Sequence, residues 1–215
     1  MITALGGGVG AAKFLAGLTE LPTSTKLNVI INTGDDIDIY GLRVSPDIDT
    51  VIYRLSGKID SKKGWGLSGD SFNFLKALSD LGVETWFNIG DKDLATHLFK
   101  MSLRRAGFDL NQITKITAEK FGLKSVNVIP MTNDHVETWI NTEEGKMHFQ
   151  EYYIKNRMEP LVKGVELRGK EHALPAPGVI DSIRDAEYII ICPSNPIISI
   201  GPILEIKGIR NEIIQ

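Results

Sequence analysis

The sequence predicts an α/β protein with a Rossmann-like, doubly wound, mainly parallel sheet and a smaller α+β insertion. An apolar run, Ile2–Leu5, ends in glycines and is followed by a segment of strong helix formers, Ala11–Leu18. A second apolar and β-branched run, Leu27–Ile31, completes a βαβ unit of ordinary length. Near the other end of the chain, Glu187–Cys192 is the run most typical of a buried strand.

Helices are predicted between these strands from capping residues and apolar spacing. Pro22 closes the first unit, and Thr33–Pro46 is expected to be a loop because glycine, aspartate and proline recur in it. The predicted helices are Asp47–Leu55, a helix from Asp70 or Ser71 to Leu81, Asp93–Ala106, a helix from Asn111 to about Phe121, and Val179–Arg184.

The middle of the chain changes character. Three short strands are predicted at Ser125–Met131, Val136–Asn141 and Lys146–Gln150, with Thr142–Gly145 as a hairpin turn. We therefore expect a core formed by residues 1–107 and 171–215 and an α+β insertion at 108–170. Residues 201–215 end within an apolar, helix-like pattern, so we expect the C-terminal part of the domain to be absent.

The composition narrows the class of protein. The 215 residues are 42% hydrophobic and 24% charged, which is ordinary for a folded domain. A net charge of −3 gives no basic field for nucleic acid or an acidic membrane. The single cysteine, Cys192, excludes an internal disulfide, and no apolar run approaches the ~20 residues of a membrane span. We expect a cytoplasmic protein that binds neither nucleic acid nor membrane.

The first candidate site is the glycine-rich turn after the first strand. It contains Gly6, Gly7, Gly8 and Gly10. Glycines let the backbone approach a phosphate, and the following helix offers free N–H groups at its N-terminus. Gly6, Gly8 and Ala11 satisfy the dinucleotide pattern G-x-G-x-x-G/A, but Asn32 and Thr33 replace the acid expected after the second strand. The alternative is a glycine turn required only for packing.

The second candidate site is acidic and follows the second strand, where ligands bind in open parallel sheets. Its acids are Asp35, Asp36, Asp38, Asp47 and Asp49. Carboxylate oxygens suit Mg²⁺, which in turn neutralises phosphate oxygens. Asp47 and Asp49 begin a helix, and at least one of them is expected to face a cleft. The alternative, capping and solvation, is favoured for Asp38.

The third candidate site follows the strand Glu187–Cys192 and opens on the same sheet edge. Ser194, Asn195 and Ser199 can hydrogen-bond a phosphate or a base, and Pro196 follows them in the turn. Cys192 has no nearby histidine and is interpreted as packing. The four histidines, His97, His135, His148 and His172, do not have the spacing of metal ligands. Trp65 and Trp86 could stack on a ring but are more typical of the core.

Taken together, these loops resemble the 2-phospho-L-lactate transferase family. The motifs are Leu-Gly-Gly-Gly-Val-Gly-Ala-Ala-Lys-Phe-Leu-Ala-Gly-Leu (5–18), Asn-Thr-Gly-Asp-Asp (32–36), Ser-Pro-Asp-Ile-Asp-Thr (45–50), Gly-Asp-Lys-Asp-Leu-Ala-Thr-His (90–97) and Cys-Pro-Ser-Asn-Pro-x-x-Ser-Ile-Gly-Pro-Ile-Leu (192–204). The resemblance implies a step of coenzyme F-420 biosynthesis. A hydroxyl of the deazaflavin FO attacks lactyl (or enolpyruvyl) diphospho-guanosine, GMP leaves, and Mg²⁺ assists.

The resemblance also implies residue roles. Asp49 would contact the deazaflavin near the attacking hydroxyl, and Asp47 or Asp49 would hold metal or orient that hydroxyl. Asn32, Thr33, Asp35 and Asp36 would line the same cleft, whereas the glycine loop and Ser194-Asn195-Pro196 would hold the guanine nucleotide. Family members commonly carry a basic residue before Ile89-Gly90-Asp91, where this chain has Asn88.

Two alternative functions remain open, and the oligomeric state is also predicted. A non-catalytic, nucleotide-sugar-binding regulatory protein of a related sister family shares the glycine loop but usually carries a different second loop. A nicotinamide dehydrogenase is disfavoured by Asn32. A homodimer is expected, with the apolar segment 197–206 as a candidate surface.

Overall fold

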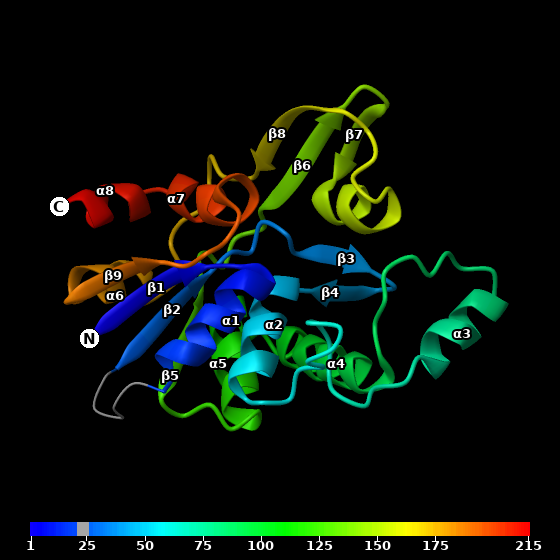
Figure 1. Ribbon diagram of the computed structural model, residues 1–215, viewed down its shortest axis with the longest axis horizontal. Coiled ribbons are helices and arrows are strands. Elements are labelled where there is room, and N and C mark those ends of the chain that lie inside the picture. Colours follow the sequence, from blue (N-terminus) through cyan, green and yellow to red (C-terminus); the bar gives the residue numbers. More distant parts are fainter. Residues whose placement is uncertain (21–25) are drawn as a thin grey trace.

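A four-stranded parallel sheet forms the centre of the computed structural model, which describes residues 1–20 and 26–215 (Figure 1). Its strands are β1 (Ile2–Gly6), β2 (Leu27–Ile31), β5 (Val126–Pro130) and β9 (Tyr188–Ile191), in the order β5-β2-β1-β9. The predicted α/β class with a parallel sheet is confirmed. Pro22, predicted to close the first unit, lies outside the described residues.

Successive residues of each central strand pack on opposite faces of the sheet. In β2, Val29 and Ile31 join one hydrophobic cluster and Ile30 joins the other. The first face is covered by α1 (Gly8–Leu18), α2 (Pro46–Leu55) and α5 (Leu110–Lys120), and the second by α6 (Val179–Arg184), α7 (Gly201–Glu205) and α8 (Ile209–Ile214). Helices therefore cover both faces, as in other doubly wound sheets.

The segment predicted as a loop, Thr33–Pro46, contains a two-stranded hairpin. Strands β3 (Ile37–Ile39) and β4 (Leu42–Val44) pair antiparallel around Tyr40 and Gly41, whose φ angles are 53° and 74°. Positive φ at both central residues suits a tight hairpin, but tyrosine is seldom found in that conformation. The hairpin was missed because its strands are short and its turn carries an unusual residue.

The insertion is a three-stranded antiparallel sheet with a short helical segment. Strand β6 (Glu137–Thr142) lies between β7 (Gly145–His148) and β8 (Val162–Arg168), and η1 (Glu151–Lys155) follows β7. The strand predicted at Ser125–Met131 was expected within this insertion, but β5 pairs with β2 in the central sheet. That pairing is a long-range contact that no local pattern reveals. Strand β8 was not predicted.

Two aspartates cap the helices α3 (Asn73–Asp80) and α4 (Asp91–Arg105). Asp70, which precedes α3, caps α4, and Asp91, the first residue of α4, caps α3. Asp70 accepts hydrogen bonds from the backbone N–H groups of Lys92 (2.8 Å) and Asp93 (3.1 Å), which belong to α4. Asp91 accepts from the N–H groups at the start of α3, and its hydrogen bonds, first that from Ser71, lower its pKa to about 2. Asp70 therefore caps a different helix from the one predicted. This exchange fixes the start of α4, which carries part of the site described below.

Strand β9 is an edge strand, which corrects the prediction that Glu187–Cys192 is fully buried. Tyr188 is 61% exposed and Ile191 is 55% exposed. Apolar content indicates that a strand packs on the sheet, but it does not tell a central strand from an edge strand. In the described part of the chain, no helix is both long and apolar enough to cross a membrane.

The segment proposed as a dimer surface, 197–206, mostly packs inside its own chain. It forms η2 (Pro196–Ile200) and α7, and Ile203 and Ile206 belong to the second hydrophobic cluster. Only Ile197, 62% exposed, presents a large apolar surface there. The homodimer stays a prediction without support from this segment.

Candidate active site

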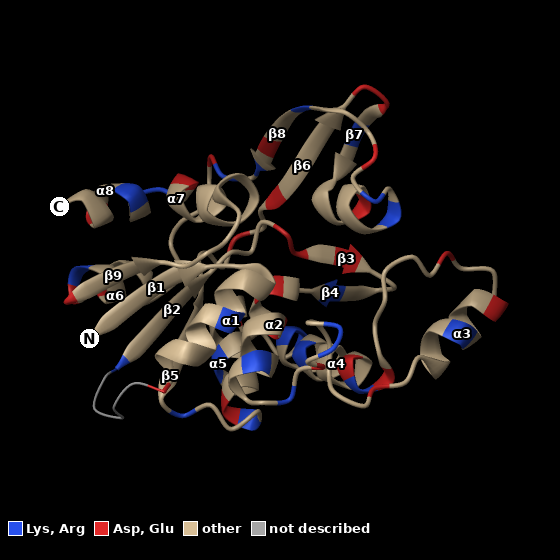
Figure 2. Ribbon diagram, in the orientation of Figure 1, with Lys and Arg blue, Asp and Glu red and all other residues tan. Residues whose placement is uncertain are grey.

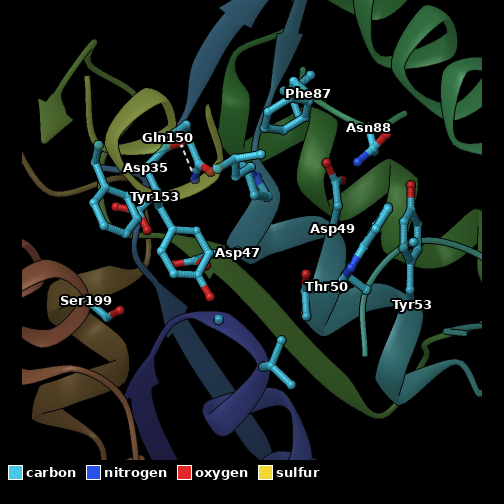
Figure 3. Close-up of a pocket in the computed structure, with 18 of the residues that line it drawn as sticks. Asp35, Asp47, Asp49, Thr50, Tyr53, Phe87, Asn88, Gln150, Tyr153 and Ser199 are labelled. Atoms are coloured by element: carbon cyan, nitrogen blue, oxygen red, sulfur yellow. Dashed lines mark hydrogen bonds between the residues drawn. The ribbon is translucent and has the colours of Figure 1, made fainter. Parts of the chain in front are cut away.

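A pocket of about 570 Å³ opens at the carboxyl ends of the central strands (Figure 3). Counted along the chain, the parallel strands have the order 3-2-1-4, and ligands of such sheets bind where the order reverses. The pocket lining includes the glycine loop (Gly8, Val9), the segment from β2 into α2 (Asp35, Asp47, Asp49), the loop after β9 (Asn195, Ser199), helix α4 (Asp93, His97) and the insertion (Phe149, Gln150, Tyr153). The sequence placed the first three there, but it missed the last two.

The glycines of the first loop divide between packing and pocket. A Cβ on Gly6 would lie 2.8 Å from the Ala11 Cβ and 2.9 Å from the Cys192 Cβ, and one on Gly10 would collide with the Pro193 carbonyl oxygen. Real Cβ contacts are never that short, so both glycines allow close packing of the loop. Gly8 lines the pocket with φ +71°, a conformation that glycine adopts without strain. Gly6 and Gly10 therefore serve packing, whereas a phosphate contact at Gly8 stays a prediction.

The loop after β9 contributes Asn195 to the pocket. The Ser194 hydroxyl accepts from the Gly7 N–H (3.2 Å) and donates to the Gly7 carbonyl (3.0 Å), so it fastens two loops together. Asn195 lines the pocket and accepts hydrogen bonds from two N–H groups of η2. Pro196 begins η2 and does not line the pocket, whereas Ser199 does.

Asp47 lies against the N-terminus of α1. It accepts a hydrogen bond from the Asn32 side-chain amide (3.0 Å), and a Cβ on Gly7 would collide with its carboxylate. Burial raises the pKa of Asp47 to about 6, against the smaller lowering effects of Asn32 and the Gly8 backbone N–H. The helix terminus that the sequence assigned to a phosphate thus already faces a buried carboxylate.

Asp35 is a second buried acid in the pocket. Burial, followed by the charge of Asp47, raises its pKa well above its ordinary value. Its Oδ1 is buried and has no hydrogen-bond partner among the described residues. The backbone carbonyl of Asp35 accepts from Gln150 Nε2 at 3.2 Å, the contact drawn in Figure 3, which ties the insertion to the acidic loop.

Asp36 and Thr33 lie behind the pocket and do not line it. The Ser45 hydroxyl donates to Asp36 at 2.7 Å, and Arg43 Nε lies 3.8 Å from the same oxygen. Burial raises the pKa of Asp36 to about 7, although Arg43 and Ser45 lower it. Asp36 is thus in the predicted region but contacts Ser45 and Arg43, and the buried Thr33 hydroxyl has no hydrogen-bond partner among the described residues.

Asp49 faces the pocket from α2 and is bound from behind by α4. Lys100 Nζ donates to both carboxylate oxygens, each at 2.8 Å. His97 lies beside this pair, with Nδ1 3.9 Å from Asp49 Oδ2 and Nε2 3.3 Å from Asp93 Oδ1. The Tyr53 hydroxyl donates to Asp93 at 2.6 Å. Sequence patterns gave no signal for this network because its members lie on two helices far apart in the chain.

Aromatic side chains form much of the remaining wall. Phe149 and Tyr153 stack with ring centroids 5.5 Å apart and an interplanar angle of 20°, and Tyr53, Trp65 and Phe87 also line the pocket. Asn88, predicted from the family motif, lines the pocket and is exposed. Flat rings with apolar faces suit an aromatic ligand. The two insertion rings were not predicted, since nothing local indicates that the insertion reaches the sheet edge.

The acids of the site gather where the chain runs from β2 into β3 and α2, whereas Lys and Arg are spread over several helices and loops (Figure 2). Among the described residues, no group of three or more His, Cys, Asp or Glu side chains is arranged to hold a metal ion.

Comparison with known proteins gives a consistent result. The family model described as 2-phospho-L-lactate transferase CofD matches residues 2–215. A 2-phospho-L-lactate transferase of Methanosarcina mazei is 42% identical over 204 residues, 95% of this chain and 67% of the relative. A phosphoenolpyruvate transferase of Streptomyces coelicolor is 42% identical over 217 residues, 99% of this chain and 68% of the relative.

A solved structure shares the fold. The crystal structure of a UPF0052 family member from Bacillus halodurans superposes with a TM-score of 0.67 at 21% identity. The alignment covers 100% of this chain and 65% of that one, so the chain spans about two thirds of the length of the proteins that it matches. At this identity the likeness establishes the doubly wound fold alone.

Proposed function

The chain belongs to the 2-phospho-L-lactate transferase family, and on that premise we propose that it transfers a 2-phospho-L-lactate or phosphoenolpyruvate group from a guanosine diphospho donor to the deazaflavin FO. GMP is the second product, and the acceptor product is an intermediate of coenzyme F-420 biosynthesis. The observation that carries this proposal is a single pocket that combines buried acids beside a helix N-terminus with several aromatic rings.

The acidic end suits the diphosphate of the donor. Helix α1 presents its N-terminal N–H groups there, and Gly8 and Asn195 are available to phosphate and nucleoside. Two buried carboxylates would repel phosphate unless a cation neutralised them. In their ionised forms, Asp35 and Asp47 therefore need a positive partner when the donor binds.

Asp35 and Asp47 fit Mg²⁺ as that partner. Both supply hard oxygen ligands, Asp35 has a buried oxygen with no hydrogen-bond partner in the described residues, and each lacks an ion pair there. When bound, Mg²⁺ would neutralise charge on the transferred phosphoryl group. We propose these two residues as its ligands in place of Asp47 and Asp49, because Lys100 already holds both oxygens of Asp49.

The reaction requires mainly positioning from the protein. The acceptor's hydroxyl oxygen bonds to the phosphorus that carries the lactyl group. The bond from that phosphorus to the bridging oxygen breaks, and GMP leaves with the electron pair. Asp49 faces the pocket on the side of Phe87 and Asn88, whereas Asp35 and Asp47 lie beside Tyr153 (Figure 3). We assign to Asp49 the role of orienting the hydroxyl and receiving its proton.

The aromatic walls suit the tricyclic ring of FO. Phe149 and Tyr153 from the insertion and Tyr53 from α2 provide ring faces and edges for stacking. The donor's acid is left open, because relatives named for lactate and for enolpyruvate are equally similar to this chain, at 42% identity each.

The test is GMP release, measured by chromatography from protein mixed with FO, Mg²⁺ and either guanosine donor. We expect GMP only when FO is present, and the faster donor identifies the acid. Asp49→Asn should lower turnover at least ~10²-fold, whereas Asp80→Asn, an exposed acid at the end of α3, should not change it. No GMP, together with no change in FO fluorescence on mixing, would favour the non-catalytic sister family.

A further inference from the structure

The ammonium group of Lys100 is buried directly behind Asp49. Lys100 lies on α4 and Asp49 on α2, 51 positions apart in sequence, and their side chains are 8% and 7% exposed. The ammonium nitrogen is 2.8 Å from each carboxylate oxygen, so it is centred on the carboxylate rather than attached at one end. Such a charge-assisted contact to both oxygens holds the position of the carboxylate group.

Asp49 differs in this respect from the two other acids of the pocket. In the described residues, Asp35 and Asp47 are stabilised by neutral amides and backbone groups, without a cation, and their pKa values are raised by burial. Asp49 alone among the three has a lysine on its carboxylate. The acids that line one pocket are therefore divided into two with no cation among the described residues and one that is paired with a lysine.

A second layer holds Lys100 and its helix in place. Asp93 and His97, two turns and one turn before Lys100 on α4, also line the pocket, and the Tyr53 hydroxyl of α2 donates to Asp93. His97 is 1% exposed and lies between the two aspartates. Helices α2 and α4 are thus connected by two buried polar contacts, and the Lys100 contact is the one that reaches Asp49.

We propose that Lys100 is a positioning residue for the transfer reaction, which holds the Asp49 carboxylate at the angle where it accepts a hydrogen bond from the acceptor's hydroxyl. This inference rests on the proposed function and extends it to a residue that does not itself line the pocket. With both Asp49 oxygens held from behind, their remaining lone pairs face the pocket. The hydroxyl meets a carboxylate that is already oriented, and Asp49 is kept from turning toward the Asp35 and Asp47 end.

A purely structural ion pair between α2 and α4 is the competing explanation. Such a pair would affect folding, but not turnover in the variants that remain folded. Four proteins separate the two explanations: Lys100→Met, which removes the charge at similar length; Lys100→Arg, whose guanidinium also binds both oxygens of a carboxylate; Asp49→Asn; and the double variant Asp49→Asn/Lys100→Met. Arg104→Met, on the exposed side of the same helix, is the matched control.

The measurement is kcat and KM for the acceptor and donor at saturating Mg²⁺. We expect Lys100→Met to lower kcat by about 10²-fold, since a misplaced reacting group has an effect of that size, with the donor KM changed less than about twofold. Lys100→Arg should recover kcat to within about tenfold of wild type. The double variant should be no slower than Asp49→Asn alone, because Lys100 acts through Asp49.

Two results would overturn the proposal. The first is folded Lys100→Met protein with wild-type kcat. The second is a double variant much slower than Asp49→Asn, which would mean that Lys100 acts independently of Asp49. If Lys100→Met does not fold, the decision passes to Lys100→Arg and to the double variant, in which no charge is left unpaired.

Failure of the proposed function has a separate signature. A wild-type protein that releases no GMP with either donor would refute the transfer reaction itself. The contact between Asp49 and Lys100 is then tested without substrate, by a double-mutant cycle in which thermal unfolding is measured. Additive changes in Tm in that cycle would overturn the contact on which the inference depends.

Discussion

Replacing Asp47 with asparagine should make the metal-free protein more stable at neutral pH, although it removes a carboxylate from the candidate active site. Burial raises the pKa of Asp47 from an ordinary 3.8 to about 6, so the charged form is disfavoured in the folded state. Asparagine has the same shape and no charge to bury. Its carbonyl oxygen can still accept a hydrogen bond from Asn32, as the carboxylate does at 3.0 Å.

The size of the effect follows from the pKa difference. A change from 3.8 to about 6 corresponds to about 3 kcal/mol of folding free energy. The folded state binds the proton more tightly, so the wild-type protein loses stability as pH rises from 3.8 to about 6 and carries the full cost above that. Allowing for a weaker Gly8 contact, Asp47→Asn should gain roughly 1–3 kcal/mol at pH 7. For a chain of this size that is roughly 3–10 °C in Tm.

The assay is thermal unfolding in EDTA between pH 4 and pH 8. The Tm of the variant should be close to that of wild type at pH 4. The difference should increase in favour of the variant between pH 4 and 6 and stay constant above that. Adding Mg²⁺ should raise the Tm of wild type and have little effect on the variant, because the proposed metal ligand is missing. Asp80→Asn removes the same charge from an exposed position and should follow wild type throughout. A variant that is less stable than wild type at pH 7, or a difference that does not change with pH, would refute this reasoning.

Two further predictions concern the glycine loop and the aromatic wall. Gly10→Ala should destabilise the protein by about 1–3 kcal/mol in urea unfolding, because the new methyl group collides with the Pro193 carbonyl. Gly17→Ala on the same helix, where no atom lies within 4 Å of the added carbon, should instead be neutral or stabilising by up to ~1 kcal/mol, and equal losses in both would contradict the packing argument. Tyr153→Ala should raise the acceptor's KM by about tenfold in the GMP-release assay with kcat little changed, since the ring contributes binding area and no reacting group. An unchanged acceptor KM would place the deazaflavin ring elsewhere in the pocket.

The division of the acids explains why carboxylates of one motif can have different tasks. Asp47 and Asp49 are two residues apart at the start of α2, and both line the pocket. Asp47 faces Asn32 and the start of α1, whereas Asp49 faces α4 and its lysine. Their roles are therefore set by the neighbouring elements and not by their position in the motif.

The sequence by itself determined the features that depend on neighbours in the chain. The apolar runs and the glycine turn specified the first βαβ unit, and the ends of its strands indicated where acids and glycines would meet. The positions of Asp35, Asp47 and Asn195 in the pocket follow from that rule. These predictions are reliable because hydrophobic periodicity and turn chemistry act over a few residues.

Only the tertiary structure decided the contacts between distant segments. It paired Lys100 with Asp49, exchanged the helix caps of Asp70 and Asp91, and brought Tyr153 of the insertion to the sheet edge. It also made β9 an edge strand, although its composition is that of a buried one. A buried charge or cap takes whichever partner the packed helices bring within reach, and that depends on how helices and sheets stack, which local sequence does not encode.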